Sequence, residues 1–148
     1  MGVGKRFADV DAKDPQMRFA SVRVITDDVE AMAAFYEDLT GVTARRWTSD
    51  FAEVPVPGGT LAIGGTPTVA LFGEGSARPA ENRSAIIEFE VDDVDAEFER
   101  LRASGRAFVR EPTTMPWGNR SLLLRDPDGT LVNLFTPISA EARARQTT

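Results

Sequence analysis

The chain repeats one short pattern, and this repeat restricts its possible folds more than any other feature of the sequence. Residues 26–29 (TDDV) end an apolar segment and open a predicted helix, and residues 91–94 (VDDV) do the same about 65 residues later. Later in each half lies a short apolar segment, at residues 68–72 (TVALF) and 131–135 (LVNLF), which we predict to be a strand. A repeat of this length indicates a duplicated module, because a solenoid needs several copies of a shorter unit. We therefore expect two similar modules that enclose a cavity.

The first half is predicted to fold as a strand, then a helix, then further strands. Residues 19–25 alternate in part and are rich in β-branched residues, which favours a strand. Asp27 or Asp28 is expected to cap the helix that follows, and Gly41 to end it. Apolar residues within this helix recur at spacings of three and four, which predicts one buried stripe. The remaining strands of this half are expected at residues 42–47 and 51–56 and as a hairpin pair within residues 60–72.

The second half repeats this order. Residues 86–91 predict a strand, Asp93 is expected to cap the next helix, and Gly105 to end it. The aspartates at the two helix starts are therefore interpreted as caps and not as paired catalytic carboxylates: Asp27, Asp28, Asp92 and Asp93. Further strands are expected at residues 107–109, 121–125 and 131–135, with a tight turn at residues 126–129 (DPDG).

Composition places the boundaries between the modules. The stretch after the first half is rich in glycine, serine and proline, which indicates a linker. The N-terminal stretch is charged and has no apolar run, so we do not expect it to be a secretory signal. We predict an N-terminal arm at residues 1–17, a first module at 18–73, a linker at 74–83, a second module at 84–137 and a C-terminal tail, helical or frayed, at 138–148.

Charge and residue counts exclude several classes of function. The net charge of −6 argues against nucleic acid as a partner, because binding to phosphates needs clustered lysine and arginine. Apolar runs are only a few residues long, so no membrane span is expected. The chain has no cysteine, which excludes disulfides and makes the cytoplasm the expected location. It has no histidine either, so the usual nucleophile–base pairs are lacking.

Two groups of residues resemble a known family. They are residues 28–29 (DV) followed by 35–36 (FY), and residues 117–118 (WG) followed by 125–134 (RDPDGTLVNL). With these motifs the chain resembles the vicinal oxygen chelate superfamily, the glyoxalase / bleomycin-resistance / extradiol-dioxygenase group, over residues 18–137. The resemblance implies an α+β fold in which two βαβββ modules form an incompletely closed, eight-stranded half-barrel. Many members of this group are dimers, so a homodimer is expected.

The resemblance also locates the positions where catalytic members of the group bind a metal. These positions fall on Ser21, Ala70, Ile86 and Asn133 in this chain. Alanine and isoleucine offer no donor atom, and a serine hydroxyl and a neutral amide lack the charge that holds a catalytic divalent ion. Glu88, two residues after Ile86 on the same strand, adds only one carboxylate. We therefore expect no metal ion and no cofactor.

Members of the group without metal ligands include antibiotic-sequestering proteins. Such a protein needs a concave apolar surface, stacking groups and a few placed polar atoms. We therefore predict a metal-independent protein that binds a small organic molecule and sequesters a planar or cationic antibiotic. Arg120 is expected to pair with an acid on the ligand, or with Glu88 or Asp126. The candidate ligand-binding residues are Ser21, Trp47, Phe51, Ile86, Glu88, Trp117, Arg120 and Asn133.

Alternative interpretations stay open at this point. The chain could be a metal-independent lyase or isomerase that uses Glu88 or Tyr36 as its base, or a protein that acts only through protein contacts. Trp47 and Trp117 could be core or interface residues, and Asn133 could only satisfy neighbouring backbone groups. Tyr36 lies on the apolar stripe of its helix, which favours packing over catalysis.

Overall fold

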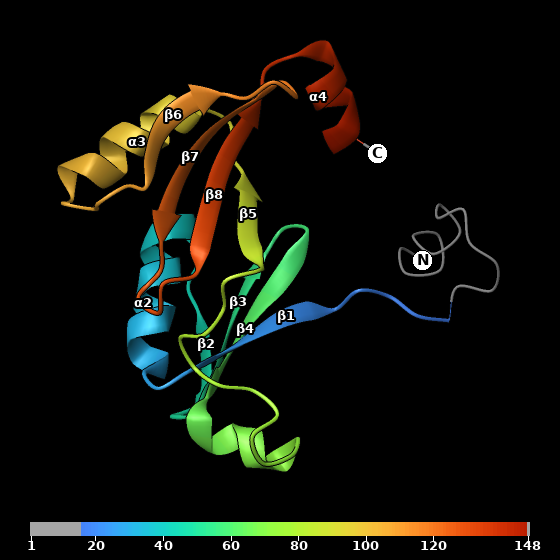
Figure 1. The fold of residues 1–148 in the computed structure, drawn as a ribbon, viewed down its shortest axis with the longest axis vertical. Coiled ribbons are helices and arrows are strands. Elements are labelled where there is room, and N and C mark those ends of the chain that lie inside the picture. Colours follow the sequence, from blue (N-terminus) through green and yellow to red (C-terminus); the bar gives the residue numbers. More distant parts are fainter. Residues whose placement is uncertain (1–15, 148) are drawn as a thin grey trace.

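The computed structural model of the chain describes residues 16–147, so most of the predicted N-terminal arm lies outside the described residues. Both halves have the expected order of one strand, one helix and three strands (Figure 1). The first contains β1 (Ser21–Thr26), α2 (Val29–Thr40), β2 (Arg45–Thr48), β3 (Phe51–Val56) and β4 (Gly59–Gly65). The second contains β5 (Ile86–Glu90), α3 (Val94–Ala103), β6 (Arg110–Thr114), β7 (Asn119–Arg125) and β8 (Leu131–Pro137). The short 3-10 helix η1 (Thr66–Leu71) follows β4, and helix α4 (Ala140–Gln146) follows β8.

Each module contributes one four-stranded sheet, and the two sheets have the same topology. The strand orders are β1-β4-β3-β2 and β5-β8-β7-β6. In both sheets the first and last strands of the module are parallel, and the other pairs are antiparallel. Arg23 lies opposite Ala62 in the first sheet, and Glu88 lies opposite Asn133 in the second. The registers therefore make Arg23 equivalent to Glu88, and Ala62 equivalent to Asn133. The fold is α+β, and the sheets do not close into a barrel.

One predicted strand is wrong. Residues 68–72 were expected to form the last strand of the first module, but residues Thr66–Leu71 form η1, and the last strand is β4. Pro67 lies in the first turn of η1, where its fixed φ and missing N–H suit a helical turn. The Thr68 hydroxyl donates a hydrogen bond to the carbonyl of Gly65 at 2.7 Å and so closes this turn. The metal-ligand position of the first module therefore falls on Ala62 and not on Ala70, which lies in η1.

The second module departs from prediction in its third element. Residues 107–109 are not a strand, and β6 begins at Arg110 instead. The helix caps, in contrast, lie where the sequence placed them. Asp28 Oδ1 accepts from the backbone N–H of Ala31 at 3.0 Å, and Asp93 Oδ1 accepts from that of Ala96 at 3.1 Å. Asp28 and Asp93 are thereby confirmed as N-caps, whereas Asp27 and Asp92, which precede them, are not caps.

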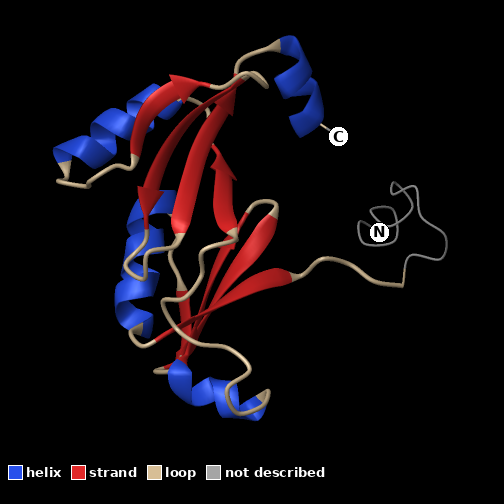
Figure 2. Cartoon of the chain, viewed as in Figure 1, coloured by secondary structure: helices blue, strands red, loops and turns tan. Residues whose placement is uncertain are grey.

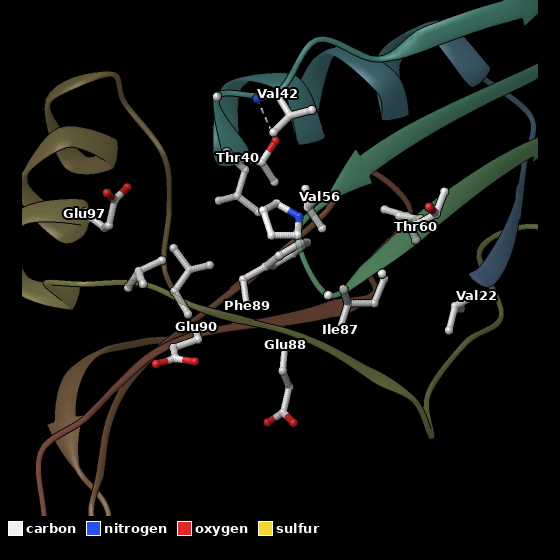
Figure 3. A pocket seen from close by; sticks show the side chains of 18 of the residues that line it. Val22, Thr40, Val42, Val56, Thr60, Ile87, Glu88, Phe89, Glu90 and Glu97 are labelled. Carbon is white, nitrogen blue, oxygen red and sulfur yellow. Dashed lines mark hydrogen bonds between the residues drawn. The ribbon is translucent and has the colours of Figure 1, made fainter. Parts of the chain in front are cut away.

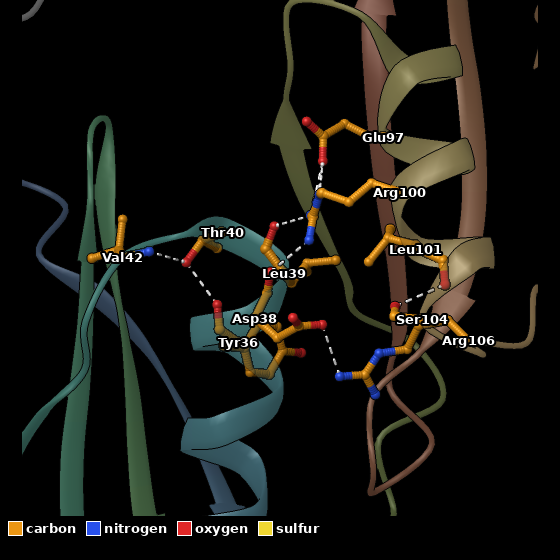
Figure 4. A network of polar contacts seen from close by, with 10 residues as sticks. All are labelled: Tyr36, Asp38, Leu39, Thr40, Val42, Glu97, Arg100, Leu101, Ser104 and Arg106. Atoms are coloured by element: carbon orange, nitrogen blue, oxygen red, sulfur yellow. Dashed lines mark hydrogen bonds and ion pairs between the residues drawn. The ribbon is translucent and has the colours of Figure 1, made fainter.

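A single hydrophobic core joins the two modules. Helices α2 and α3 cover the same side of the two sheets in the view of Figure 2. The buried face of α2 belongs to one core cluster with residues of β3 and β4 and with Leu122, Leu124, Val132 and Leu134 of the second sheet. Polar contacts reinforce this junction (Figure 4), because Arg100 donates to the carbonyl of Asp38 at 3.0 Å and Arg106 pairs with the Asp38 carboxylate at 3.0 Å. The modules therefore dock through their helix-covered sides.

Each sheet has a second face, on the side opposite to the helix-covered core. Successive residues of a strand point to opposite faces, so residues that alternate with core residues face away from α2 and α3. We call this side the open face of each sheet. Among the described residues, no helix is long and apolar enough to cross a membrane.

Candidate functional site

The open face of the first sheet carries an arginine and several aromatic side chains. Ala52 and Val54 of β3 lie in the core, so Phe51 and Glu53, which alternate with them, belong to the open face. The Arg23 guanidinium carbon lies 4.7 Å from the ring centroid of Phe51. The indole N–H of Trp47 on β2 donates to Glu53 Oε1 at 2.9 Å. These contacts place Arg23, Phe51, Glu53 and Trp47 on the same face.

This face presents flat apolar surfaces to solvent. Trp47 is 59% exposed, and Phe72, which follows η1, is 67% exposed. The Arg23 guanidinium carbon lies 5.3 Å from the ring centroid of Phe72, so Arg23 contacts two rings at once. The hydrogen bond to Glu53 fixes the orientation of the Trp47 indole. Large, rigid aromatic surfaces of this kind bind planar molecules by stacking.

The open face of the second sheet carries several polar side chains beside apolar ones such as Ile86 and Phe135. Asn133 Nδ2 donates to Glu88 Oε2 at 2.9 Å, across the parallel pair β5 and β8. Three buried oxygen atoms on this face have no hydrogen-bond partner among the described residues: Asn119 Oδ1, Ser121 Oγ and Asn133 Oδ1. Ser121 is only 2% exposed. Since buried polar atoms are nearly always hydrogen-bonded, this row of unpartnered oxygens is unusual for a purely structural face.

The structure divides the predicted ligand-binding residues into separate groups. Ser21, Trp47 and Phe51 lie on the open face of the first sheet, and Ile86, Glu88 and Asn133 on that of the second. Trp117 lies apart from both groups, in a small hollow against α4, where its carbonyl accepts from Arg145 Nη2 at 2.6 Å.

Arg120 lies on the helix-covered side of the second sheet. Its Nε is 2.8 Å from Asp95 Oδ2 of α3, so the expected pairing with Glu88 or Asp126 is wrong. The reason is its place in β7, where Arg120 alternates with Asn119 and Ser121, which occupy the open face. The hydrogen bond from Arg120 holds the pKa of the Asp95 carboxyl below its usual range.

Sequence reasoning missed Arg23 and Phe72. Arg23 is two residues after Ser21 on the same strand, and a period of two would have placed both on one face. Phe72 was assigned to a strand that does not form, and no sequence signal placed its ring beside Arg23.

The metal-ligand positions do not fit a catalytic metal ion. With the register of β4 they fall on Ser21, Ala62, Ile86 and Asn133, a set without a carboxylate or an imidazole. Across the described part of the chain, no three acidic residues come together in a geometry that could hold a metal ion. The structure assigns the second position of the set to Ala62 in place of Ala70, and since both are alanines the set of donor atoms is unchanged.

Tyr36 is placed in the core, as its position on the helix stripe indicated. It is fully buried, and its hydroxyl donates to Asp126 Oδ2 at 2.7 Å. Burial, together with the neighbouring Asp126 carboxylate, raises the pKa of Tyr36 far above its usual value. The tyrosine faces neither open face, so the interpretation of Tyr36 as a catalytic base has no geometric support.

A cavity lies between the modules, beside the edge strands β1 and β5 (Figure 3). Its volume is about 920 Å³, and Val22, Val42, Val56, Ile87 and Phe89 give it an apolar lining. Figure 3 shows the Glu88 carboxylate on the opposite side of β5, pointing away from this cavity. The cavity is therefore on the helix-covered side of the edge strands, and the open faces are a separate surface.

Comparisons with known proteins agree with this architecture. A profile of the Glyoxalase/Bleomycin resistance protein/Dioxygenase superfamily matches residues 18–134, so the chain belongs to this superfamily. A glyoxalase/bleomycin resistance protein/dioxygenase from Nocardioides superposes with a TM-score of 0.69 at 22% identity, over 93% of this chain and 92% of that chain. A glyoxalase/bleomycin resistance protein/dioxygenase family enzyme from Burkholderia phytofirmans PsJN gives a TM-score of 0.69 at 17% identity, over 80% and 98%. A glyoxalase-related enzyme from Fulvimarina pelagi gives 0.68 at 24% identity, over 84% and 94%. No curated protein matches the chain by sequence.

Proposed function

We propose that this protein binds a planar organic molecule on the open face of its first sheet, without a metal ion. The observation that carries the proposal is the aromatic surface formed by the exposed Trp47 and Phe72 and the half-buried Phe51. Family membership supports a role in small-molecule binding, and bleomycin resistance proteins belong to the same superfamily. By this reasoning the chain sequesters its ligand as an antibiotic-binding protein does, through apolar burial and stacking.

The donor set supports a metal-free mode of binding. Ser21 and Asn133 offer only neutral oxygen atoms, and Ala62 and Ile86 offer none, so a catalytic Mn, Fe, Ni or Zn ion would lack its usual ligands. Sequestration requires no such ion, because a ligand held by stacking and burial needs no activated water or Lewis acid.

A second copy of the chain is the expected partner. The edge strands β1 and β5 each pair on one side only, and exposed apolar residues lie on or near them, such as Val22 and Ile86. Free sheet edges and exposed apolar residues favour association. The homodimer and the cytoplasmic location stay predictions, and sedimentation of the purified protein tests the first.

The proposal is tested by a thermal-shift screen of the purified protein against planar natural products. Each compound is measured with and without Mn, Fe(II), Ni and Zn. We expect one class of compound to raise the melting temperature by the same amount with and without metal. Stabilisation only in the presence of a metal would contradict the proposal and restore a metal-dependent function.

Substitution of Trp47 then locates the ligand. Trp47→Ala should weaken binding by about 1–3 kcal/mol, the scale of an aromatic anchor, or about 5- to 150-fold in Kd. Trp47→Phe keeps an aromatic ring and is the matched control, with a smaller loss expected. Trp117→Ala tests separately whether the ligand also reaches the α4 hollow. Unchanged affinity of Trp47→Ala would place the ligand elsewhere.

A further inference from the structure

Arg23 is held in place without an acidic partner. Six arginines of the described residues pair with carboxylates, namely Arg46, Arg78, Arg100, Arg102, Arg106 and Arg120. Within residues 16–147, the Arg23 side chain makes no hydrogen bond or ion pair, and the contacts that hold its guanidinium are those with the rings of Phe51 and Phe72. Its guanidinium thus lies in cation–π contact with two rings, and its N–H donors have no partner among the described residues.

A glycine in the central strand β4 leaves space for the Arg23 side chain. Phe51 lies opposite Gly64, and Gly64 lies between Arg23's strand and Phe51's strand in the sheet order. A Cβ atom at Gly64 would lie 3.3 Å from Arg23 Nη1, which is tighter than most such contacts. A glycine at this point leaves room for the arginine side chain to cross β4 and reach the phenyl ring.

The second module has no counterpart of this arrangement. By register, Arg23 is equivalent to Glu88, and Gly64 is equivalent to Phe135, a buried residue. The duplicated fold therefore carries opposite charges at one equivalent position, and only the first module has the glycine that accommodates the long side chain. The cationic site is a property of the first module alone.

The chemistry of this guanidinium defines its ligand. Its contacts with the two rings use none of its N–H donors, and a planar guanidinium matches a carboxylate with two parallel hydrogen bonds. The two rings also restrict the side chain before binding, so less rotamer entropy is lost when an anion arrives. We propose that Arg23 binds a carboxylate group of the planar ligand, an inference that rests on the proposed function.

The surrounding charges orient such a ligand. Glu53, beside Trp47, would repel a carboxylate, so the acid belongs at the β1 side of the face and the aromatic rings belong toward Trp47. The net charge of −6 opposes an anion at long range, but salt screens this repulsion beyond a Debye length of about 8 Å. The first sheet therefore favours an acidic planar ligand over the cationic ligand considered from the sequence.

The test uses three naphthalenes that differ only in one substituent: 2-naphthoate, 2-naphthamide and 2-naphthylmethylammonium. Isothermal titration measures each with the full-length wild type and with Arg23→Gln, Arg23→Lys and Arg102→Gln. Arg102 is an exposed arginine of α3, so its variant has the same change of net charge away from the site. The melting temperature of each variant shows whether the fold is intact.

We expect naphthoate to bind about tenfold more tightly than naphthamide, the usual gain from a hydrogen bond to a charged group. Arg23→Gln should remove this difference, Arg23→Lys should retain part of it, and Arg102→Gln should retain all of it. Equal affinity for naphthoate and naphthamide, preference for the ammonium compound, or equal losses in Arg23→Gln and Arg102→Gln would overturn the carboxylate site. Binding of none of the probes up to their solubility limits would overturn the planar-ligand function as well.

Discussion

Removal of the Tyr36 hydroxyl should weaken the contact between the two modules and lower the stability of the protein. The Tyr36 hydroxyl donates to Asp126 Oδ2 at 2.7 Å and so connects α2 to the turn between β7 and β8. The other carboxylate oxygen accepts from the backbone N–H groups of Asp128 and Thr130. In the variant Tyr36→Phe the ring and its packing remain, but Oδ2 loses the donor that it has in the native structure.

The expected cost follows from burial of the acceptor. Asp126 is 5% exposed, so water cannot readily replace the lost donor. A hydrogen bond to a charged group contributes about 1.5–3 kcal/mol, and we expect Tyr36→Phe to lower the free energy of unfolding by this amount. Domains of this kind have only about 5–15 kcal/mol of total stability, so the change is readily measured by urea denaturation.

The cost should also depend on pH. Burial raises the pKa of Asp126, and the Tyr36 hydrogen bond opposes this rise, so the variant should have an even higher pKa. The cost is then largest above that pKa and decreases as the pH falls through it, because a protonated carboxyl no longer needs the donor. Urea midpoints of both proteins, measured from neutral pH toward the ordinary aspartate pKa of about 4, test this. A cost below about 0.5 kcal/mol, within the range of ordinary surface substitutions, or one independent of pH, would refute the reasoning.

The remaining predictions concern a tight turn and an acidic group. Gly118→Ala should destabilise the protein by about 2–4 kcal/mol in urea denaturation, because φ is +95° and the new Cβ would lie 2.7 Å from Ser139 Cβ. Gly58→Ala, with φ +93° and no heavy atom within 4 Å, is the matched control and should lose only the part due to backbone strain. A hydrogen bond from Arg46 lowers the pKa of Glu37 from 4.5 to about 2, so its stabilisation is present above the higher value and is lost as the pH falls through the lower one. Glu37→Gln should therefore lose less stability than the wild type on acidification, and equal losses measured by urea midpoints would contradict this.

The sequence predicted the elements whose determinants are local. Asp28 and Asp93 cap their helices because a short acceptor side chain before an apolar periodic stretch is sufficient to start a helix. The order of strands and helices followed from the repeat in the same way. The 3-10 turn after β4 was missed, because the apolar residues after Pro67 also suit a strand, and only the contacts of Thr66 and Thr68 close the turn.

The candidate site depended on information that a sequence does not contain. Arg120 was grouped with Glu88, but a shift of one residue along β7 moves a side chain to the other face of the sheet. On the helix-covered face, Arg120 pairs with Asp95 of α3. Arg23 became visible only through its side-chain contacts, because the register pairs it with Ala62, while its guanidinium lies beside Gly64 and the Phe51 ring. Residue type alone therefore identified aromatic and polar candidates, whereas the strand registers determined which of these candidates lie on the same face of a sheet.

The parallel pairing of first and last strands has a consequence for how the protein forms. Ser21 lies opposite Thr60 and Ile86 opposite Leu131, separations of 39 and 45 residues. The loop-closure entropy of such pairings is lost before the contacts form, which slows folding relative to chains with mostly local contacts. On the ribosome, neither sheet can be completed until the last strand of its module has emerged from the exit tunnel. β1 therefore stays without its partner strand until β4 has been synthesised, and an unpaired strand of this kind can pair with another chain in that interval.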